Sequence, residues 1–81
     1  MMDDTEKRLA GCFQVVFPGI SEATIPTASQ ATVPEWDSVA AITMVSVIED
    51  EFGVELDLDD LADLDSFEKI HAYVQKRLQV A

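Results

Sequence analysis

The chain has 81 residues, of which 16 are acidic and five are basic, and its formal net charge is −11. The length predicts a single domain, and a hydrophobic content of 48% is too high for an intrinsically disordered chain. Nucleic-acid binding needs clustered Lys and Arg, and the chain has neither between Leu9 and Glu68. The composition therefore argues against nucleic-acid partners and favours basic protein partners, whose approach an acidic surface accelerates.

The same composition bears on the compartment. A single cysteine, Cys12, excludes an internal disulfide and fits a reducing environment. The first residues lack the basic segment of a signal peptide, and no apolar run approaches the ~20 residues needed to span a bilayer. We therefore expect a soluble, cytoplasmic protein without membrane insertion, and we expect it to be a monomer.

The first predicted helix covers about residues 3–17. Apolar residues recur there at the spacing of one helical face: Leu9, Cys12, Phe13, Val16 and Phe17. Pro18 and Gly19 end the helix. From there to Asp37 the chain is rich in Ser, Thr, Ala and Pro and has no helical periodicity, and Pro26 and Pro34 would interrupt a helix. This segment is predicted to be a long loop, and long loops in small domains are often functional.

The second predicted helix covers residues 38–52, with Asp37 or Ser38 as its N-cap and Gly53 at its C-terminal end. Apolar residues cover most of its circumference, and only a narrow side is polar, formed by Thr43, Ser46 and Asp50. A helix this apolar is either deeply buried or docks against a partner.

Two further helices complete the predicted fold. A short one covers residues 58–64, where Leu58, Leu61 and Leu64 are three apart, and the last covers residues 66–79. Asp65 and Glu68 are predicted to form a capping box at the start of the last helix. The fold class is therefore all-α, a four-helix bundle of three main helices and one short helix, with a long loop between the first two helices. Residues 1–81 form its single domain.

Patterns for catalysis are weak. The only histidine, His71, lies in the last helix, without the oriented base and nucleophile that serine hydrolases require. We expect His71 to be a partly exposed helix residue and Cys12 to be a buried core residue. No catalytic residue is predicted.

One acidic stretch has partial EF-hand spacing. Asp57, Asp59, Asp65 and Glu68 occupy positions 1, 3, 9 and 12 of such a frame. Leu61 and Ala62 stand where the frame needs an oxygen ligand and a glycine. No metal ligand is therefore predicted.

The strongest candidate site is the hydroxyl of Ser38, where the long loop meets the second helix. An ordinary N-cap would explain an isolated Asp-Ser pair. The N-terminus of a helix also presents free N–H groups and a positive dipole end, which favour a phosphodiester. A serine there is suited to carry a phosphate-linked group in an exposed position.

The stretch WDSVAAITMVSVIEDEFGVEL, from Trp36 to Leu56, resembles the acyl carrier protein family. The signature of that family is Asp-Ser-Leu followed by an apolar and acidic helix that ends in Glu-Glu-Glu-Phe or a similar sequence. The spacing from Ser38 to Glu49, Asp50, Glu51 and Phe52 matches without a gap. LDDLADLDSFEKIHAYV, residues 58–74, resembles the third and fourth helices of the family.

The resemblance implies an acyl-carrier-like bundle whose Ser38 carries 4′-phosphopantetheine, which makes it a phosphoprotein. Trp36, Asp37 and Val39 would be the neighbours of the attachment motif. A phosphopantetheinyl transferase would move the arm from coenzyme A, and the thiol of the arm would hold acyl groups as thioesters. The protein itself would be non-catalytic and would present acyl groups to enzymes of fatty acid, lipid or specialised metabolite biosynthesis.

The resemblance also implies two surfaces. Acyl-loading and acyl-transferring enzymes of the family usually dock through basic patches on the second helix, here at Ala40, Thr43, Ser46, Val47, Glu49 and Asp50. Some members shelter the acyl chain between helices, for which the candidate lining is Phe13, Phe17, Ile42, Val45, Leu61 and Leu64. Core packing is the simpler explanation of these apolar residues.

Several residues depart from the family pattern. Val39 replaces the usual leucine, Ala40 and Thr43 stand where fatty-acid-synthesis carriers have acids, and Trp36 is typical of dedicated carriers. These residues indicate a specialised carrier rather than the housekeeping one. An aminoacyl or peptidyl carrier, which typically has Gly-Gly before the serine region, and an unmodified acidic interaction module are the alternatives. The intact Ser38 argues against the second.

Overall fold

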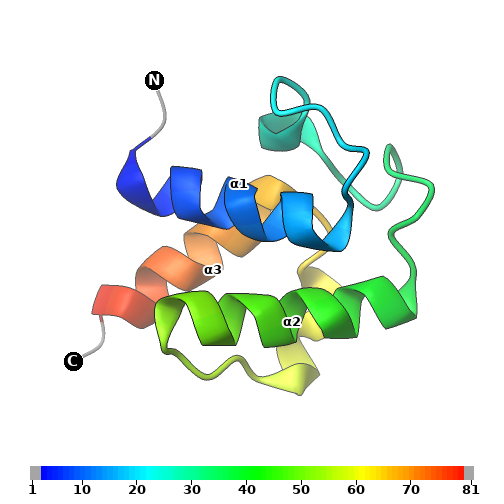
Figure 1. Ribbon diagram of the computed structural model, residues 1–81. Coiled ribbons are helices and arrows are strands. Elements are labelled where there is room, and N and C mark those ends of the chain that lie inside the picture. The colour runs from blue at the N-terminus through cyan, green and yellow to red at the C-terminus, as the bar shows by residue number, and fades with distance from the viewer. Residues whose placement is uncertain (1–2, 80–81) are drawn as a thin grey trace.

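Figure 1 shows the computed structural model of the chain, which describes residues 3–79 apart from the side chain of Leu58. Three α-helices form the molecule: α1 (Asp4–Val16), α2 (Ser38–Phe52) and α3 (Phe67–Gln79). Two short 3₁₀ segments lie between them, η1 (Ile25–Thr27) and η2 (Leu58–Asp63). The predicted all-α class is confirmed.

The start and end of α1 are fixed locally. The Asp3 carboxylate accepts a hydrogen bond from the Glu6 N–H at 2.8 Å, which satisfies one of the free donors of the first turn. The Phe17 N–H donates to the Phe13 carbonyl at 2.7 Å and closes the last turn before Pro18. The helix is therefore one residue shorter at each end than the predicted range of 3–17.

The core is centred on Phe13, which is fully buried. Its ring centroid lies 5.4 Å from that of Trp36 and 5.2 Å from that of Phe67, both edge to face. Such aromatic pairs contribute about 0.5–1.5 kcal/mol beyond the area they bury. This cluster joins α1, the end of the long loop and the start of α3 into one packed unit.

The short helix predicted over 58–64 is a 3₁₀ segment. The Asp57 carboxylate caps it by accepting from the Asp59 N–H at 2.9 Å, and the Leu64 N–H donates to the Leu61 carbonyl at 3.1 Å. In a 3₁₀ helix, residues three apart lie on the same side. Leu61 is half-buried and Leu64 is buried, so a leucine spacing of three serves this geometry as well as an α-helix.

The predicted start of the last helix was wrong in detail. Ser66, not Asp65, caps α3, because its hydroxyl accepts from the Lys69 N–H at 3.2 Å. The Asp65 carboxylate instead pairs with the Lys69 ammonium at 3.1 Å. Serine is among the preferred N-cap residues because its hydroxyl accepts from a free backbone N–H of the first turn. The helix α3 therefore begins at Phe67, directly after Ser66, and the predicted capping box of Asp65 and Glu68 does not form its start.

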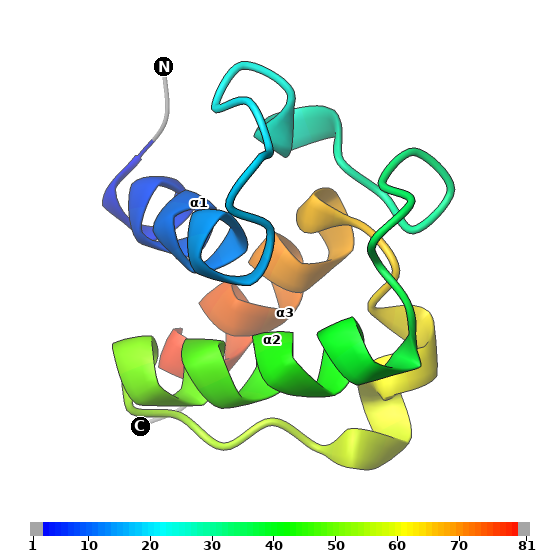
Figure 2. The ribbon, with the colours of Figure 1, turned by 45° about the vertical axis from the view of Figure 1, so that its right-hand side comes forward.

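The predicted loop between α1 and α2 is a fixed part of the fold. Four of its side chains are buried: Ile25, Ala28, Val33 and Trp36. Its backbone also pairs with the start of α3, since the Phe67 N–H donates to Ala28 at 2.9 Å and the Gln30 N–H donates to Asp65 at 2.8 Å. Figure 2 shows the loop arching from the end of α1 over the start of α3 to the start of α2.

The sequence did not predict the 3₁₀ turn η1 inside this loop, because a proline such as Pro26 interrupts the interior of a helix. Proline is tolerated in a first turn, where its missing N–H has no partner to lose. Pro26 lies in that first turn.

Within residues 3–79, none of the helices combines the length and the apolar character that crossing a bilayer requires.

Candidate functional site

Ser38 is the first residue of α2, and its side chain is exposed. The helix cap is supplied by Asp37, whose carboxylate accepts from the Ala40 N–H at 2.8 Å, and the Asp37 carbonyl accepts from the Ala41 N–H at 2.9 Å. The N–H groups of Ser38 and Val39 stand in the first turn, where no carbonyl of the helix reaches them. The hydroxyl therefore sits on the surface beside backbone donors and the positive end of the helix.

Trp36 holds this end of α2 in place. Its side chain is only 4% exposed, and besides Phe13 it packs against Phe17 at a centroid distance of 5.8 Å. The backbone N–H of Trp36 donates to the Val33 carbonyl at 3.0 Å. Within two residues the chain thus passes from the core to the surface, so the position of Ser38 is tied to the aromatic cluster.

A surface groove of about 330 Å³ borders Ser38. Its walls come from the loop, the first turns of α2 and η2, and the lining includes Trp36, Ala41, Ile42, Leu61 and Leu64. The hydroxyl of Tyr73 on α3 steadies the η2 wall by donating to the Asp60 carboxylate at 2.9 Å. The groove therefore offers a shallow, largely apolar path that begins at the hydroxyl of Ser38.

Beneath this groove lies a much smaller gap of about 10 Å³ between α2 and α3. Trp36, Ala41, Leu61 and Leu64 line both spaces. A cavity needs roughly 10–15 Å³ of this measure to hold one water molecule. As lined by the described side chains, this gap is therefore too small for a chain of several carbon atoms unless those side chains move.

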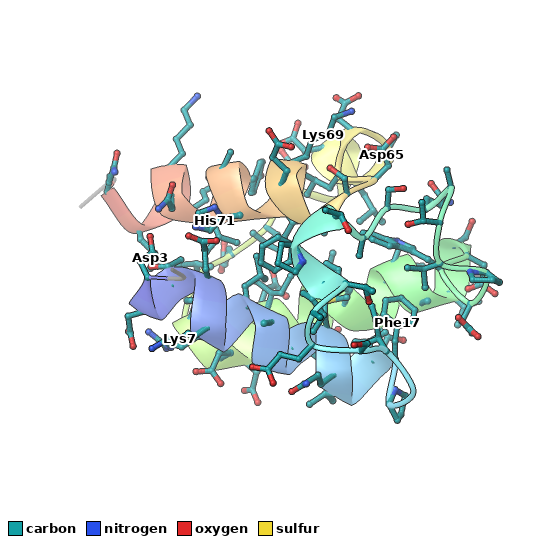
Figure 3. The ribbon with its side chains drawn as sticks, turned by 90° about the horizontal axis from the view of Figure 1, so that it is seen from above. Asp3, Lys7, Phe17, Asp65, Lys69 and His71 are labelled. Atoms are coloured by element: carbon teal, nitrogen blue, oxygen red, sulfur yellow. The ribbon has the colours of Figure 1, made fainter. Side chains whose placement is uncertain are left out.

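The six residues predicted to line an acyl site are separated by the structure. Leu61 and Leu64 line both the groove and the inner gap, Val45 lines only the gap, and Ile42 lines only the groove. Phe13 is enclosed by aromatic rings. Phe17 lines a different hollow, of about 520 Å³, between the end of α1 and the long loop. Figure 3 labels Phe17, and it lies near that end of α1.

The residues predicted to meet partner enzymes lie along α2 with different exposures. Thr43, Ser46 and Asp50 are exposed, whereas Ala40, Val47 and Glu49 are half-buried. The sequence analysis gave Val39 as a neighbour of the attachment motif and Ile42 as a candidate acyl-chain lining, but it assigned neither to the docking surface. Their side chains are 72% and 55% exposed. Residues three apart lie on the same face of a helix, so these two side chains form a small apolar patch beside the candidate site.

The fold itself employs two of the three acids at the end of α2. The Glu49 carboxylate accepts from the Leu56 N–H at 2.8 Å, and the Glu51 carboxylate pairs with the Arg8 guanidinium at 2.9 Å. Arg8 also lies over the ring of Phe52, 4.6 Å from its centroid. Asp50 is the acid of this group that remains exposed without such a role.

The residues set aside as structural lie as expected. Cys12 is 3% exposed, and His71 is half-buried on α3. Burial raises the pKa of the Cys12 thiol to about 11, and the carboxylate of Glu51 adds to the rise. In the EF-hand-like stretch, Asp57 caps η2 and Asp65 pairs with Lys69.

A family model described as a phosphopantetheine attachment site matches residues 36–74. The matched segment starts at the buried Trp36, contains the exposed Ser38 and ends at the buried Val74 of α3. Residues 36–74 are therefore a phosphopantetheine-carrier domain. The acyl carrier proteins are members of this family, and its domain carries 4′-phosphopantetheine attached covalently to a serine.

The other two comparisons add no relatives. Neither the search of curated proteins nor the search of solved structures gave a significant match. The residues at the start of α2 fit the carrier family, since an exposed hydroxyl beside free amides suits a phosphodiester. Phosphopantetheinyl transferases modify such domains, and partner enzymes then use them.

Proposed function

We propose that this carrier protein holds acyl groups as thioesters on 4′-phosphopantetheine attached to Ser38 and does not itself catalyse their chemistry. The observation that supports this most directly is the exposed Ser38 hydroxyl on the first residue of α2, inside the matched segment. The Asp37 cap and the buried Trp36 fix the backbone on which that hydroxyl stands.

The role of the chain at this site is positional. The first-turn N–H groups of Ser38 and Val39 lie beside the hydroxyl and can donate to the oxygens of an attached phosphodiester. The arm supplies a thiol for thioester formation, and the loading and transfer reactions belong to the partner enzymes. This division of work suits a domain whose described residues enclose no deep cleft beside Ser38.

We further propose that partner enzymes dock along the exposed side of α2. The apolar side chains of Val39 and Ile42 flank Ser38 and would form its centre, with Thr43, Ser46 and Asp50 further along the helix. Because Glu49 and Glu51 are engaged within the fold, Asp50 is the acid best placed to meet a basic patch of a partner. A docking surface poor in free acids favours partners of a specialised pathway over those of housekeeping fatty acid synthesis.

The attachment site is tested by mass spectrometry. Purified protein is incubated with coenzyme A, Mg²⁺ and a broad-specificity phosphopantetheinyl transferase, and its intact mass is measured. We expect a gain of one phosphopantetheine, which is abolished in Ser38→Ala and retained in Ser21→Ala, a matched change of another exposed serine. No gain in the wild type would favour an unmodified interaction module, and a gain in Ser38→Ala would show that another residue is modified.

The same mass spectra can separate acyl from aminoacyl carriers. The arm ejected from protein made in its native host carries the mass of its cargo. We expect acyl groups without an amino group, such as fatty acyl groups. Amino acids or peptides on the arm would instead identify an aminoacyl or peptidyl carrier.

We also propose that the acyl chain lies in the outer groove, against Ile42 and the edge of Trp36, and not among the core residues. Trp36 is the only tryptophan of the chain, so its fluorescence reports on the groove. An octanoyl arm is expected to shift the emission of Trp36 relative to an acetyl arm, and Ile42→Lys should reduce the shift. Large octanoyl-dependent NMR shifts at the buried Ile70 of α3 would instead place the chain inside the bundle.

A further inference from the structure

A second cluster of chemically capable side chains lies away from Ser38. Asp3 and Glu6 at the start of α1 and His71 in α3 each offer one ligand atom, and these three atoms all lie within 4.8 Å of one another. Figure 3 shows Asp3 and His71 facing each other across the two helices. In Figure 1 the start of α1 and the start of α2 lie at opposite ends of the molecule.

The imidazole of His71 is held with one nitrogen directed at the carboxylates. Its ring stacks on Phe67 at a centroid distance of 6.1 Å and an angle of 16°. Nε2 is buried and has no hydrogen-bond partner among the described residues. The nearest carboxylate oxygen, Oδ1 of Asp3, is 3.9 Å away, which is too far for a hydrogen bond.

This arrangement leaves the Nε2 atom of His71 without a hydrogen-bond partner among the described residues. A buried nitrogen without a partner is unfavourable, and the carboxylates of Asp3 and Glu6 lie close to this one. A single cation between the three side chains would satisfy all of them. A proton on Nε2 would serve one carboxylate at a time, because the N–H points in one direction.

We propose that Asp3, Glu6 and His71 bind one divalent transition-metal ion, with Zn²⁺ as the best-fitting class. Imidazole nitrogen with carboxylate oxygen is a donor set that zinc accepts, whereas Mg²⁺ and Ca²⁺ prefer oxygen alone. Tetrahedral zinc with bonds of about 2.0–2.2 Å places its ligand atoms about 3.3–3.6 Å apart. Ligand atoms that lie up to 4.8 Å apart reach this geometry when the two carboxylate side chains rotate toward His71.

The carboxylates are free to make that adjustment. The Asp3 side chain is 53% exposed, and its other contacts are the cap to the Glu6 N–H at 2.8 Å and the Gln75 amide at 3.5 Å. A carboxylate has about four lone-pair directions, so Asp3 can cap α1 and bind a metal at once. A bound ion would tie the start of α1 to α3.

The proposal is tested by titrating the whole protein with Zn²⁺ in a calorimeter, with excess Mg²⁺ present to occupy diffuse acidic sites. We expect one equivalent to bind, and at least tenfold weaker binding in His71→Gln and in Asp3→Asn. Asparagine keeps the helix cap, so Asp3→Asn separates metal binding from folding. Asp63→Asn removes an exposed acid elsewhere and should leave the affinity unchanged.

A second readout identifies the ligand atom. In the zinc-bound protein, the ¹⁵N resonance of His71 Nε2 should shift, while circular dichroism shows that each variant remains folded. Equal zinc affinity in wild type and His71→Gln, or no saturable binding, would overturn the proposal. An Nε2 resonance that does not move when zinc is added would also overturn it. None of these outcomes depends on the modification of Ser38.

Discussion

Ser38 and Trp36 are two residues apart and have opposite environments. The hydroxyl is exposed, whereas the indole is 4% exposed and packed among phenylalanine rings. A carrier needs its attachment point accessible and also well placed, and this pair meets both needs at once. The motif predicts Ser38 as the attachment point, whereas the anchoring by Trp36 depends on contacts with residues distant in the chain.

Cys12 provides a prediction at the same scale. Burial raises the pKa of its thiol from 9.0 to about 11, so the folded state favours the neutral thiol. The stabilisation is fully present below pH 9 and is lost as the pH rises from 9 to about 11. The loss amounts to at most about 3 kcal/mol for this shift. Urea unfolding at a series of pH values measures it.

Other groups also titrate in that range, so the test compares wild type with Cys12→Ala. The variant is less stable at neutral pH because it leaves a small cavity. Its free energy of unfolding should nevertheless fall less steeply between pH 9 and 11. Parallel curves for the two proteins would contradict the prediction.

At the scale of the helix, the end of α2 shows that neighbouring acids can have unrelated roles. Glu49, Asp50 and Glu51 are adjacent in the sequence and form one acidic motif. In the structure the first accepts from the Leu56 N–H, the third pairs with Arg8, and only Asp50 remains exposed without such a role. Two acids at the end of α2 thus hold the helix to the following segment and to α1, and one acid, Asp50, is left exposed to solvent.

This division predicts that one of two neighbouring substitutions lowers stability and that the other slows modification by the transferase. Glu49→Ala should lower the free energy of unfolding by about 1–3 kcal/mol, because it leaves a part-buried N–H without an acceptor. Asp50→Lys should change it by less than about 0.5 kcal/mol but should slow modification by a phosphopantetheinyl transferase with a basic docking patch. Urea unfolding and initial rates measure the two effects.

Glu49→Gln is the matched control, since an amide oxygen can still accept from Leu56. It should retain most of the stability that Glu49→Ala loses. If Asp50→Lys lowered the melting temperature as clearly as it slowed the transfer, this residue would support the fold rather than docking.

At the scale of the whole molecule, the three α-helices could be predicted from the sequence because each has a long apolar periodicity. The stop at Gly53 could be predicted too, since it acts on adjacent residues; Gly53 adopts φ 66°, which favours glycine. The sequence left the cap of α2 open between Asp37 and Ser38, and the structure assigns it to Asp37. Helix bounds were accurate within one residue for α1, α2 and α3. Local chemistry thus determined most of this architecture.

What could not be predicted depends on contacts between distant residues. The 3₁₀ geometry of η2 cannot be told from a short α-helix when leucines are three apart. The choice of Ser66 over Asp65 as a cap follows from where the long loop pairs with the chain. The groove beside Ser38 is formed by the loop, α2 and η2 together, so no single pattern describes it. The same is true of the meeting of His71 with Asp3.

The pairing of the long loop with the start of α3 has a consequence for biosynthesis. Ala28 accepts from Phe67, and the ring of Phe67 supports Phe13, on which Trp36 packs. The surroundings of Ser38 are therefore completed by a residue made 29 positions later in translation. A ribosome-bound chain that ends before Phe67 would present the serine on an unsupported segment, so loading of the carrier should follow release of α3 from the exit tunnel.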